Sequence, residues 1–241
     1  MGKRSKISWT ESTWNPVTGC SRISEGCKNC YALPLAERLK VMGLPSYQNG
    51  AKLTIHENLL DLPLKWKSPR TIFVNSMSDL FHEQVPDDFI ESVFKTMNAA
   101  HWHNFQILTK RSDRMLKLSS KLNWTDNIWM GVTVEASDYV FRIEDLRNTG
   151  ARVKFISFEP LLSSIQYIDL HSIGWVIVGG ESGPGARPVQ SSWVIELRDL
   201  CQKGGIPFFF KQWGGFNKKK RGRELDGRTW DEMPHESVAR V

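Results

Sequence analysis

Short and nearly continuous apolar runs recur along the chain from residue 71 onward. They are rich in Val, Ile, Phe and Trp and do not alternate with polar residues, a pattern typical of strands buried on both faces of a sheet. The runs begin near residues 71, 105, 128, 153, 175 and 207, so successive starts are 34, 23, 25, 22 and 32 residues apart. This is the spacing of parallel strands joined by crossover helices.

Amphipathic stretches fill the intervals between these runs. The stretch that follows Pro86 opens with proline and two acidic residues, which suits a helix N-terminus, and places Phe89, Val93 and Met97 on one face. The patterns predict helices over residues 31–42, 86–94, 112–121, 136–148 and 193–202, the last ending near Gly204.

The alternation of strands and helices predicts an α/β fold. With a first strand around residues 7–14 and another candidate over residues 52–56, the strand count reaches seven or eight. We therefore expect a single (β/α) barrel, complete or partial, over residues 1–216, followed by a basic C-terminal tail over residues 217–241. A doubly wound open sheet is the alternative.

The charge of the chain is concentrated near its two ends. Lys and Arg number 32 against 26 Asp and Glu, a net charge of +6, of which residues 217–228 contribute +4 and Lys3, Arg4 and Lys6 contribute +3. The remainder is close to neutral, which excludes a polyanion-binding surface spread over the whole protein. The tail is a candidate contact for a nucleotide, a nucleic acid or a partner protein, and a solvated terminus is the alternative.

No apolar run approaches the length that a membrane span needs, and residues 1–6 lack the apolar segment of a signal peptide. We expect a cytoplasmic protein that does not contact a membrane.

Polar and charged residues follow the predicted strands. Because right-handed crossovers bring the C-terminal ends of parallel strands to one face, where such folds keep their chemistry, we expect these side chains to converge. The alternative is that each strand simply ends where polar residues begin. The candidate catalytic residues are Asp79, Lys110, Glu135, Glu159 and Lys211.

A glycine-rich segment, Gly179-Gly180-Glu181-Ser182, directly follows one of these strands. Bare backbone can approach a ligand closely there, and Glu181 favours a ligand with an amine or hydroxyl over a phosphate. A turn that needs positive φ explains the glycines equally well. These four residues are candidates for binding a cofactor.

Three of the four cysteines lie within eleven positions, as Cys20, Cys27 and Cys30. In a cytoplasmic chain, clustered thiols are more often metal ligands or redox groups than disulfides. Because no second ligand pair follows, a 4Fe–4S cluster with one iron open to a small molecule is favoured, and zinc is the alternative. Cys201 is expected to face the core from a helix.

The segment Lys28-Asn29-Cys30-Tyr31-Ala32, before the first helix of a predicted barrel, resembles the cluster loop of radical S-adenosylmethionine enzymes, among them spore photoproduct lyases. Over nearly the whole chain the sequence resembles the three-cysteine-motif proteins of phages and bacteria. The segments that carry this second resemblance are 13–20, 76–82, 108–111, 131–135, 158–162, 178–185 and 208–214. Trp14, Asn15 and Ser78 lie in these segments, and we add them to the candidate cofactor-binding residues; Trp14 is a candidate for stacking on a flat ligand, with core packing as the alternative.

These resemblances imply a radical S-adenosylmethionine-like enzyme that acts on a nucleotide or nucleic acid, with S-adenosylmethionine as the cofactor at the open iron. Two other functions stay open. One is a non-enzymatic or redox-sensing iron–sulfur protein that binds nucleic acid or a partner protein. The other is a zinc-stabilised barrel that performs hydrolysis.

Overall fold

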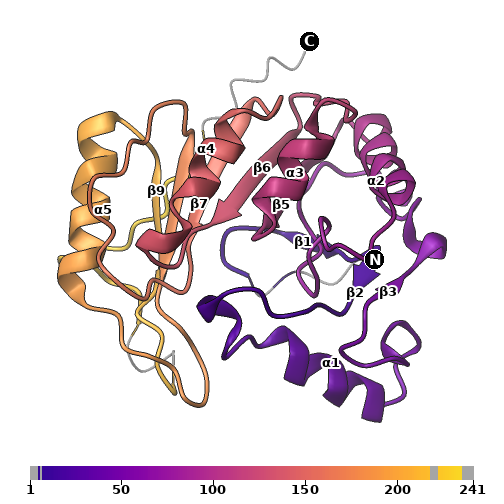
Figure 1. Ribbon diagram of the computed structural model, residues 1–241, viewed down its shortest axis with the longest axis horizontal. Helices are drawn as coiled ribbons and strands as arrows, with labels where there is room; N and C mark the ends of the chain where they lie inside the picture. The colour runs from indigo at the N-terminus through magenta and orange to yellow at the C-terminus, as the bar shows by residue number, and fades with distance from the viewer. Residues whose placement is uncertain (1–4, 6, 218–221, 235–241) are drawn as a thin grey trace.

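A single sheet of seven parallel strands organises the protein, and the computed structural model describes residues 5, 7–217 and 222–234. The sheet is curled into a half-barrel (Figure 1), which confirms the predicted (β/α) barrel in its partial form. In spatial order the strands are β1 (Ser12–Trp14), β4 (Thr71–Val74), β5 (Asn104–Thr109), β6 (Ile128–Thr133), β7 (Val153–Phe158), β8 (Trp175–Gly179) and β9 (Phe208–Gln212).

The six strands expected from residue 71 onward are confirmed, because each apolar run is buried. All six residues of β6, for example, are buried. The strand expected over residues 52–56 does not join this sheet, and that expectation is corrected: β3 (Thr54–Ile55) pairs antiparallel with β2 (Val17–Thr18). Two half-buried residues are too short a run to fill a position in a buried parallel sheet.

Five α-helices accompany the strands within the described residues, and they lie close to the ranges that the periodicity predicts. Figure 1 shows α1 on the side of β2 and β3, apart from the other four. The longest, α5, ends where Gly205 adopts a left-handed conformation with φ of 64°. Among the described residues, no helix is long and apolar enough to cross a bilayer. The α-helices are α1 (Ala32–Val41), α2 (Asp87–Ala99), α3 (Ser112–Ser119), α4 (Phe141–Arg147) and α5 (Ser191–Gly204).

Short 3-10 turns occupy much of the rest of the chain. The helix expected over residues 136–148 is divided into one such turn and α4. The turns are η1 (Glu25–Cys27), η2 (Pro45–Tyr47), η3 (Glu57–Leu59), η4 (Pro63–Lys65) and η5 (Ser137–Tyr139).

The two faces of the sheet bury different kinds of side chain. The main core lies between the sheet and helices α2–α5, whereas the opposite face carries a separate aromatic cluster. Gly131 in β6 makes room for this cluster, because a Cβ there would overlap the ring of Phe155. The aromatic cluster consists of Trp9, Phe73, Trp129, Phe155, Trp175, Ile177 and Phe209.

The described residues after position 221 return to the sheet. The backbone N–H of Phe210 donates to the carbonyl of Trp230 at 2.9 Å, and the indole of Trp175 donates to the carbonyl of Glu232 at 2.9 Å. Leu225 and Trp230 are buried in the main core. We call residues 222–234 the C-terminal strap.

The basic residues Lys218–Arg221, like Lys3, Arg4 and Lys6 at the other end, lie outside the described residues. The prediction of a polyanion contact there therefore stays a prediction.

Candidate functional site

Residues 20–30, which we call the cysteine loop, are fixed at both ends by hydrogen bonds. At the start, Gly19 has a φ of 79°, and a Cβ on it would overlap the backbone of Lys52, so glycine lets two chain segments pass closely. The N–H of Cys20 then donates to the carbonyl of Ala51 at 3.2 Å. At the end, the hydroxyl of Tyr31 donates to the carbonyl of Ser76 at 2.9 Å. The loop is thus tied to the segments beside β2 and β4.

The first contact of the cysteine loop with a strand end is made by Glu135, which follows β6 and is fully buried. Its carboxylate accepts a hydrogen bond from Ser24 Oγ at 2.5 Å and pairs with Arg142 at 2.7 Å. Lys110 Nζ lies 3.7 Å from the same carboxylate. Gly26 packs directly on it, because a Cβ there would overlap the carboxylate. Glu135 therefore anchors the 3-10 turn that holds Cys27.

The second contact joins the cysteine loop to the glycine-rich segment after β8. Asn29 Nδ2 donates to Glu181 at 3.0 Å and to the carbonyl of Gly185 at 2.9 Å. Arg187 holds the same carboxylate at 2.6 Å and also donates to the carbonyl of Glu25 at 3.0 Å. Burial raises the pKa of Glu181, but the hydrogen bonds from Arg187 and Asn29 outweigh it and lower the pKa to about 2. The ionised carboxylate of Glu181 therefore holds the cysteine loop and the glycine-rich segment together.

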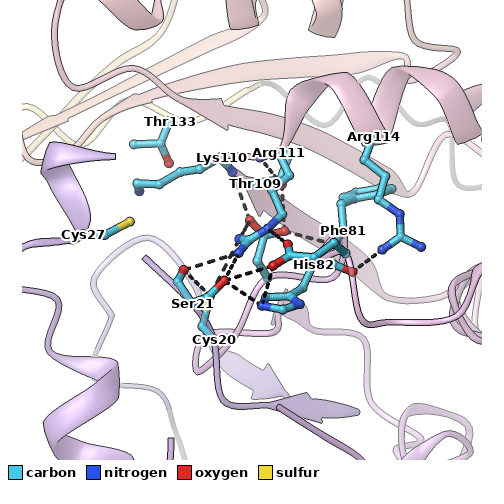
Figure 2. A network of polar contacts seen from close by, with 12 residues as sticks. Cys20, Ser21, Cys27, Phe81, His82, Thr109, Lys110, Arg111, Arg114 and Thr133 are labelled. Atoms are coloured by element: carbon cyan, nitrogen blue, oxygen red, sulfur yellow. Dashed lines mark hydrogen bonds and ion pairs between the residues drawn. The ribbon is translucent and has the colours of Figure 1, made fainter. Parts of the chain in front are cut away.

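The third contact lies at the end of β5, where Arg111 reaches Ser21 and Cys20 (Figure 2). Arg111 Nη2 donates to Ser21 Oγ at 2.8 Å, and Nη1 lies 3.8 Å from Cys20 Sγ. Asp79 holds Arg111 at 3.1 Å and also accepts hydrogen bonds from Thr109 Oγ1 and from the N–H of Lys110. Buried and fully bonded, Asp79 supports the site by holding Arg111 in place.

Ser21 and His82 lie 2.9 Å apart, Oγ to Nε2, but they are not arranged as a nucleophile and its base. The N–H of Gln84 donates to His82 Nδ1, so the proton of the neutral ring is on Nε2 and points at the serine. The hydroxyl of Ser21 donates to Glu83 at 3.2 Å. A serine whose histidine partner donates to it cannot lose its proton to that partner.

Glu159 and Lys211 form a further pair, after β7 and at the end of β9, with Nζ 3.0 Å from Oε1. Gly179 packs against this pair, because a Cβ there would overlap the Glu159 carboxylate. Gly180 lies against the carbonyl of Trp213, and Ser182 bonds to Gln212 at 2.5 Å. Here the glycines serve close packing between β8 and β9.

The remaining candidates hold neighbouring segments together. Trp14 is 1% exposed in the main core, where its indole N–H donates to the carbonyl of Leu59 at 2.8 Å, so no face of the ring is open to a flat ligand. Asn15 Oδ1 accepts from the N–H of Met77 at 3.2 Å, and Ser78 Oγ donates to the carbonyl of Val17 at 2.8 Å. Core packing, the alternative interpretation of Trp14, is the one that its environment supports.

The three thiols of the cysteine loop are free and half-buried, whereas Cys201 is fully buried in α5. Burial and the charge of Asp79 raise the pKa of Cys20 to about 11. Burial also opposes ionisation of Cys27, but a hydrogen bond with the backbone of Ile23 and the charge of Lys110 outweigh it and lower its pKa. Figure 2 shows Lys110 directed toward Cys27.

The donor set fits a soft metal or an iron–sulfur cluster, because three thiols share one loop and each of Cys20 and Cys27 has a cation nearby. Across residues 5, 7–217 and 222–234, however, no three His, Cys, Asp or Glu side chains are gathered closely enough to form a ligand set, so the fit is one of donor chemistry and not of a preformed site.

Several residues that build this site carry no recognisable sequence motif. Ser24 is an ordinary loop residue, Asn29 stands out only as a neighbour of Cys30, and Arg142 and Arg187 lie beyond the predicted strand ends. Of the residues that build the site without a motif, Arg111 could have been found from its position, because it directly follows Lys110 at the end of a predicted strand.

A partial (β/α) barrel that carries a three-thiol loop across its strand ends defines the class of this protein. The chain belongs to the family described as "Protein of unknown function (DUF5131)", whose model matches residues 4–234. No curated protein matches the sequence.

Solved structures of spore photoproduct lyase share the fold. The enzyme complexed with dinucleoside spore photoproduct matches with a TM-score of 0.50 and 12% identity, over 75% of this chain and 58% of that chain. A double mutant with bound AdoMet and dinucleoside spore photoproduct matches with a TM-score of 0.48 and 13% identity, over 74% of this chain and 58% of that chain. The chain thus spans little more than half the length of these enzymes, and the likeness is one of fold.

Proposed function

We propose that this protein is a radical S-adenosylmethionine-like iron–sulfur enzyme that acts on a nucleotide or nucleic acid. The observation that carries the proposal is the placement of the cysteine loop. Three separate contacts, at Ser21, Ser24 and Asn29, hold it against the ends of β5, β6 and β8. The C-terminal strand ends are where (β/α) folds keep their active sites.

Cys20, Cys27 and Cys30 would hold the cluster. A 4Fe–4S cluster on three thiolates would leave one iron without a protein ligand; in radical S-adenosylmethionine enzymes that iron binds the cofactor, and the reduced cluster supplies the electron for its cleavage. The partly exposed Lys110 and Lys211 would orient polar groups of the substrate, each held in place by a carboxylate, Glu135 or Glu159. Asp79 would act through Arg111.

The substrate class rests on two supports. The fold is shared with spore photoproduct lyase, which has been solved in complex with dinucleoside spore photoproduct. In addition, residues 217–228 carry a local charge of +4 that would attract phosphate.

Anaerobic purification of the full chain followed by iron and sulfide analysis tests the cluster. We expect iron and sulfide in the wild type, their loss in Cys20→Ala, Cys27→Ala and Cys30→Ala, and their retention in the matched control Cys201→Ala. Formation of 5′-deoxyadenosine from S-adenosylmethionine after reduction tests the reaction. A colourless protein that contains zinc, or iron content that all three loop variants retain, would rule the proposal out.

One observation favours a second candidate, an iron–sulfur protein that does not cleave S-adenosylmethionine. Radical S-adenosylmethionine enzymes carry a Gly-Gly-Glu-Pro segment that grips the amino group of the methionine, and Gly179-Gly180-Glu181 resembles the first three residues of that segment. Here the carboxylate of Glu181 is already held by Arg187 and Asn29. A cluster-loaded protein that yields no 5′-deoxyadenosine would favour this second function.

A further inference from the structure

Arg111 is a buried arginine that uses all three guanidinium nitrogens at the start of the cysteine loop. Nε pairs with Glu83 at 2.9 Å, Nη1 with Asp79 at 3.1 Å, and Nη2 donates to the carbonyl and hydroxyl of Ser21 at 3.3 and 2.8 Å. Only 6% of the residue is exposed. A planar fork held by several partners has little freedom to move, so Arg111 fixes the position of the backbone at Ser21.

The same guanidinium stands between two groups that carry negative charge when ionised. Nη1 lies 3.1 Å from Asp79 Oδ2 and 3.8 Å from Cys20 Sγ. Asp79 cannot turn away, because Thr109 Oγ1 and the N–H groups of Phe81 and Lys110 also hold its carboxylate. Without Arg111, a thiolate at Cys20 would face a buried carboxylate with no cation beside it, which is costly at low dielectric.

We infer that Arg111 is a positioning residue that fixes Cys20 for cluster binding and supplies the positive charge that offsets the negative cluster. This inference rests on the proposed function and adds a residue to it. A fixed positive charge and a hydrogen bond donated to a ligand sulfur both favour the reduced state of an iron–sulfur cluster. Arg111 therefore raises the reduction potential of the cluster as well as holding its loop.

The test uses the full chain, reconstituted anaerobically with ferrous iron and sulfide, and compares iron content and midpoint potential among variants. We expect Arg111→Gln to lose iron and to shift the potential of the remaining cluster to more negative values. Arg111→Lys keeps the positive charge but cannot contact Glu83, Asp79 and Ser21 together as the guanidinium does. We therefore expect reduced iron content with a midpoint potential near that of the wild type. Ser21→Ala removes one contact of the fork and should likewise lower iron content alone.

Arg198→Gln is the matched control, because Arg198 lies on α5 and pairs with Asp199 and Asp226, neither of which contacts the cysteine loop. We expect it to leave both readouts unchanged. If the wild type binds a cluster and Arg111→Gln has the same iron content and midpoint potential, the inference is overturned while the proposed function stands. If Arg111→Gln does not fold, wild-type iron content in both Arg111→Lys and Ser21→Ala would overturn it. A wild-type chain that binds no iron would overturn both proposals.

Discussion

Single glycines at three positions allow neighbouring side chains to pack where a methyl group would not fit. Gly26 and Gly179 adjoin the carboxylates of Glu135 and Glu159, and Gly131 lies beneath the ring of Phe155. At the residue scale, the architecture of the site depends on these small positions as much as on its charged groups.

Gly131→Ala tests this dependence away from the cysteines. Because the added methyl overlaps a fully buried ring in the aromatic cluster, we expect the free energy of unfolding to fall by about 1–3 kcal/mol. Urea denaturation followed by tryptophan fluorescence measures it. Gly174→Ala is the control, since a Cβ there would be in ordinary contact at 3.6 Å from the carbonyl of Lys154. Equal stability of the two variants would contradict the packing argument.

At this scale the sequence locates the charged residues but not their partners. Glu135 and Glu181 can be found because each follows an apolar strand. That Glu135 would be bonded by Ser24, and Glu181 by Asn29, depends on how the cysteine loop crosses the strand ends, which no local pattern determines. Tertiary contacts with Leu59 and Phe105 likewise bury Trp14 in the core, where periodicity alone left both interpretations open.

At the scale of elements, a buried histidine connects the turn between α2 and β5 to the segment around Pro63. His103 Nε2 lies 3.1 Å from the carbonyl of Pro63, and its ring packs against Trp66 and Phe105. Burial lowers the pKa of His103 below its usual 6.5, since it outweighs the opposing hydrogen bond to Pro63. The neutral ring is therefore the form that the fold accommodates.

Stability should consequently depend on pH below neutrality. The unfolded chain takes up a proton on His103 near pH 6.5, whereas the folded chain does so only at lower pH, so the stabilisation is complete above 6.5 and is lost as the pH falls through the folded pKa. We expect a lower free energy of unfolding at about pH 5.5 than at about pH 7.5, and a smaller decrease in His103→Gln. His101→Gln, on an exposed neighbour, should retain the full decrease; an identical decrease in both variants would refute this origin.

Strands could be predicted from the sequence where both of their faces are buried, because their apolar residues then form a continuous run. β4 to β9 follow long apolar runs, and α2 shows a clear apolar face, so pattern alone places them. Apart from α1, the first 70 residues are different: β1, β2 and β3 are two or three residues long, and short 3-10 turns take the place of longer helices. Such short elements are held by tertiary contacts, for example the bond from the N–H of Gly19 to the carbonyl of Met77, which leave no periodic signal.

At the scale of the whole molecule, the C-terminal strap completes the sheet. Trp230 lies beside Phe208 with ring centroids 5.8 Å apart, and Asp231 forms an antiparallel bridge with Phe209. The six basic residues within positions 217–228 suggest a tail, and they conceal two buried apolar residues: Leu225, which lies within this run, and Trp230, which follows it.

Deleting residues 222–241 and, separately, residues 235–241 measures what the strap contributes. The difference between the two truncated chains isolates residues 222–234. Since burying a large apolar side chain contributes about 1.5–3 kcal/mol, loss of Leu225 and Trp230 together should make the shorter chain several kcal/mol less stable. Denaturant unfolding reports the difference, and equal midpoints for both truncations would show that the strap adds nothing to the fold.

The contacts of the cysteine loop have a consequence for biosynthesis. Ser21 precedes its partner Arg111 by 90 residues in the sequence, Ser24 precedes Glu135 by 111, and Asn29 precedes Glu181 by 152. During translation the three thiols leave the ribosome before Arg111, Glu135 and Glu181, while domains generally fold as units. Under the proposed function, metal loading would therefore follow release of the finished polypeptide, and a nascent chain stalled before Arg111 would present three thiols without any of these contacts to an oxidant in its surroundings.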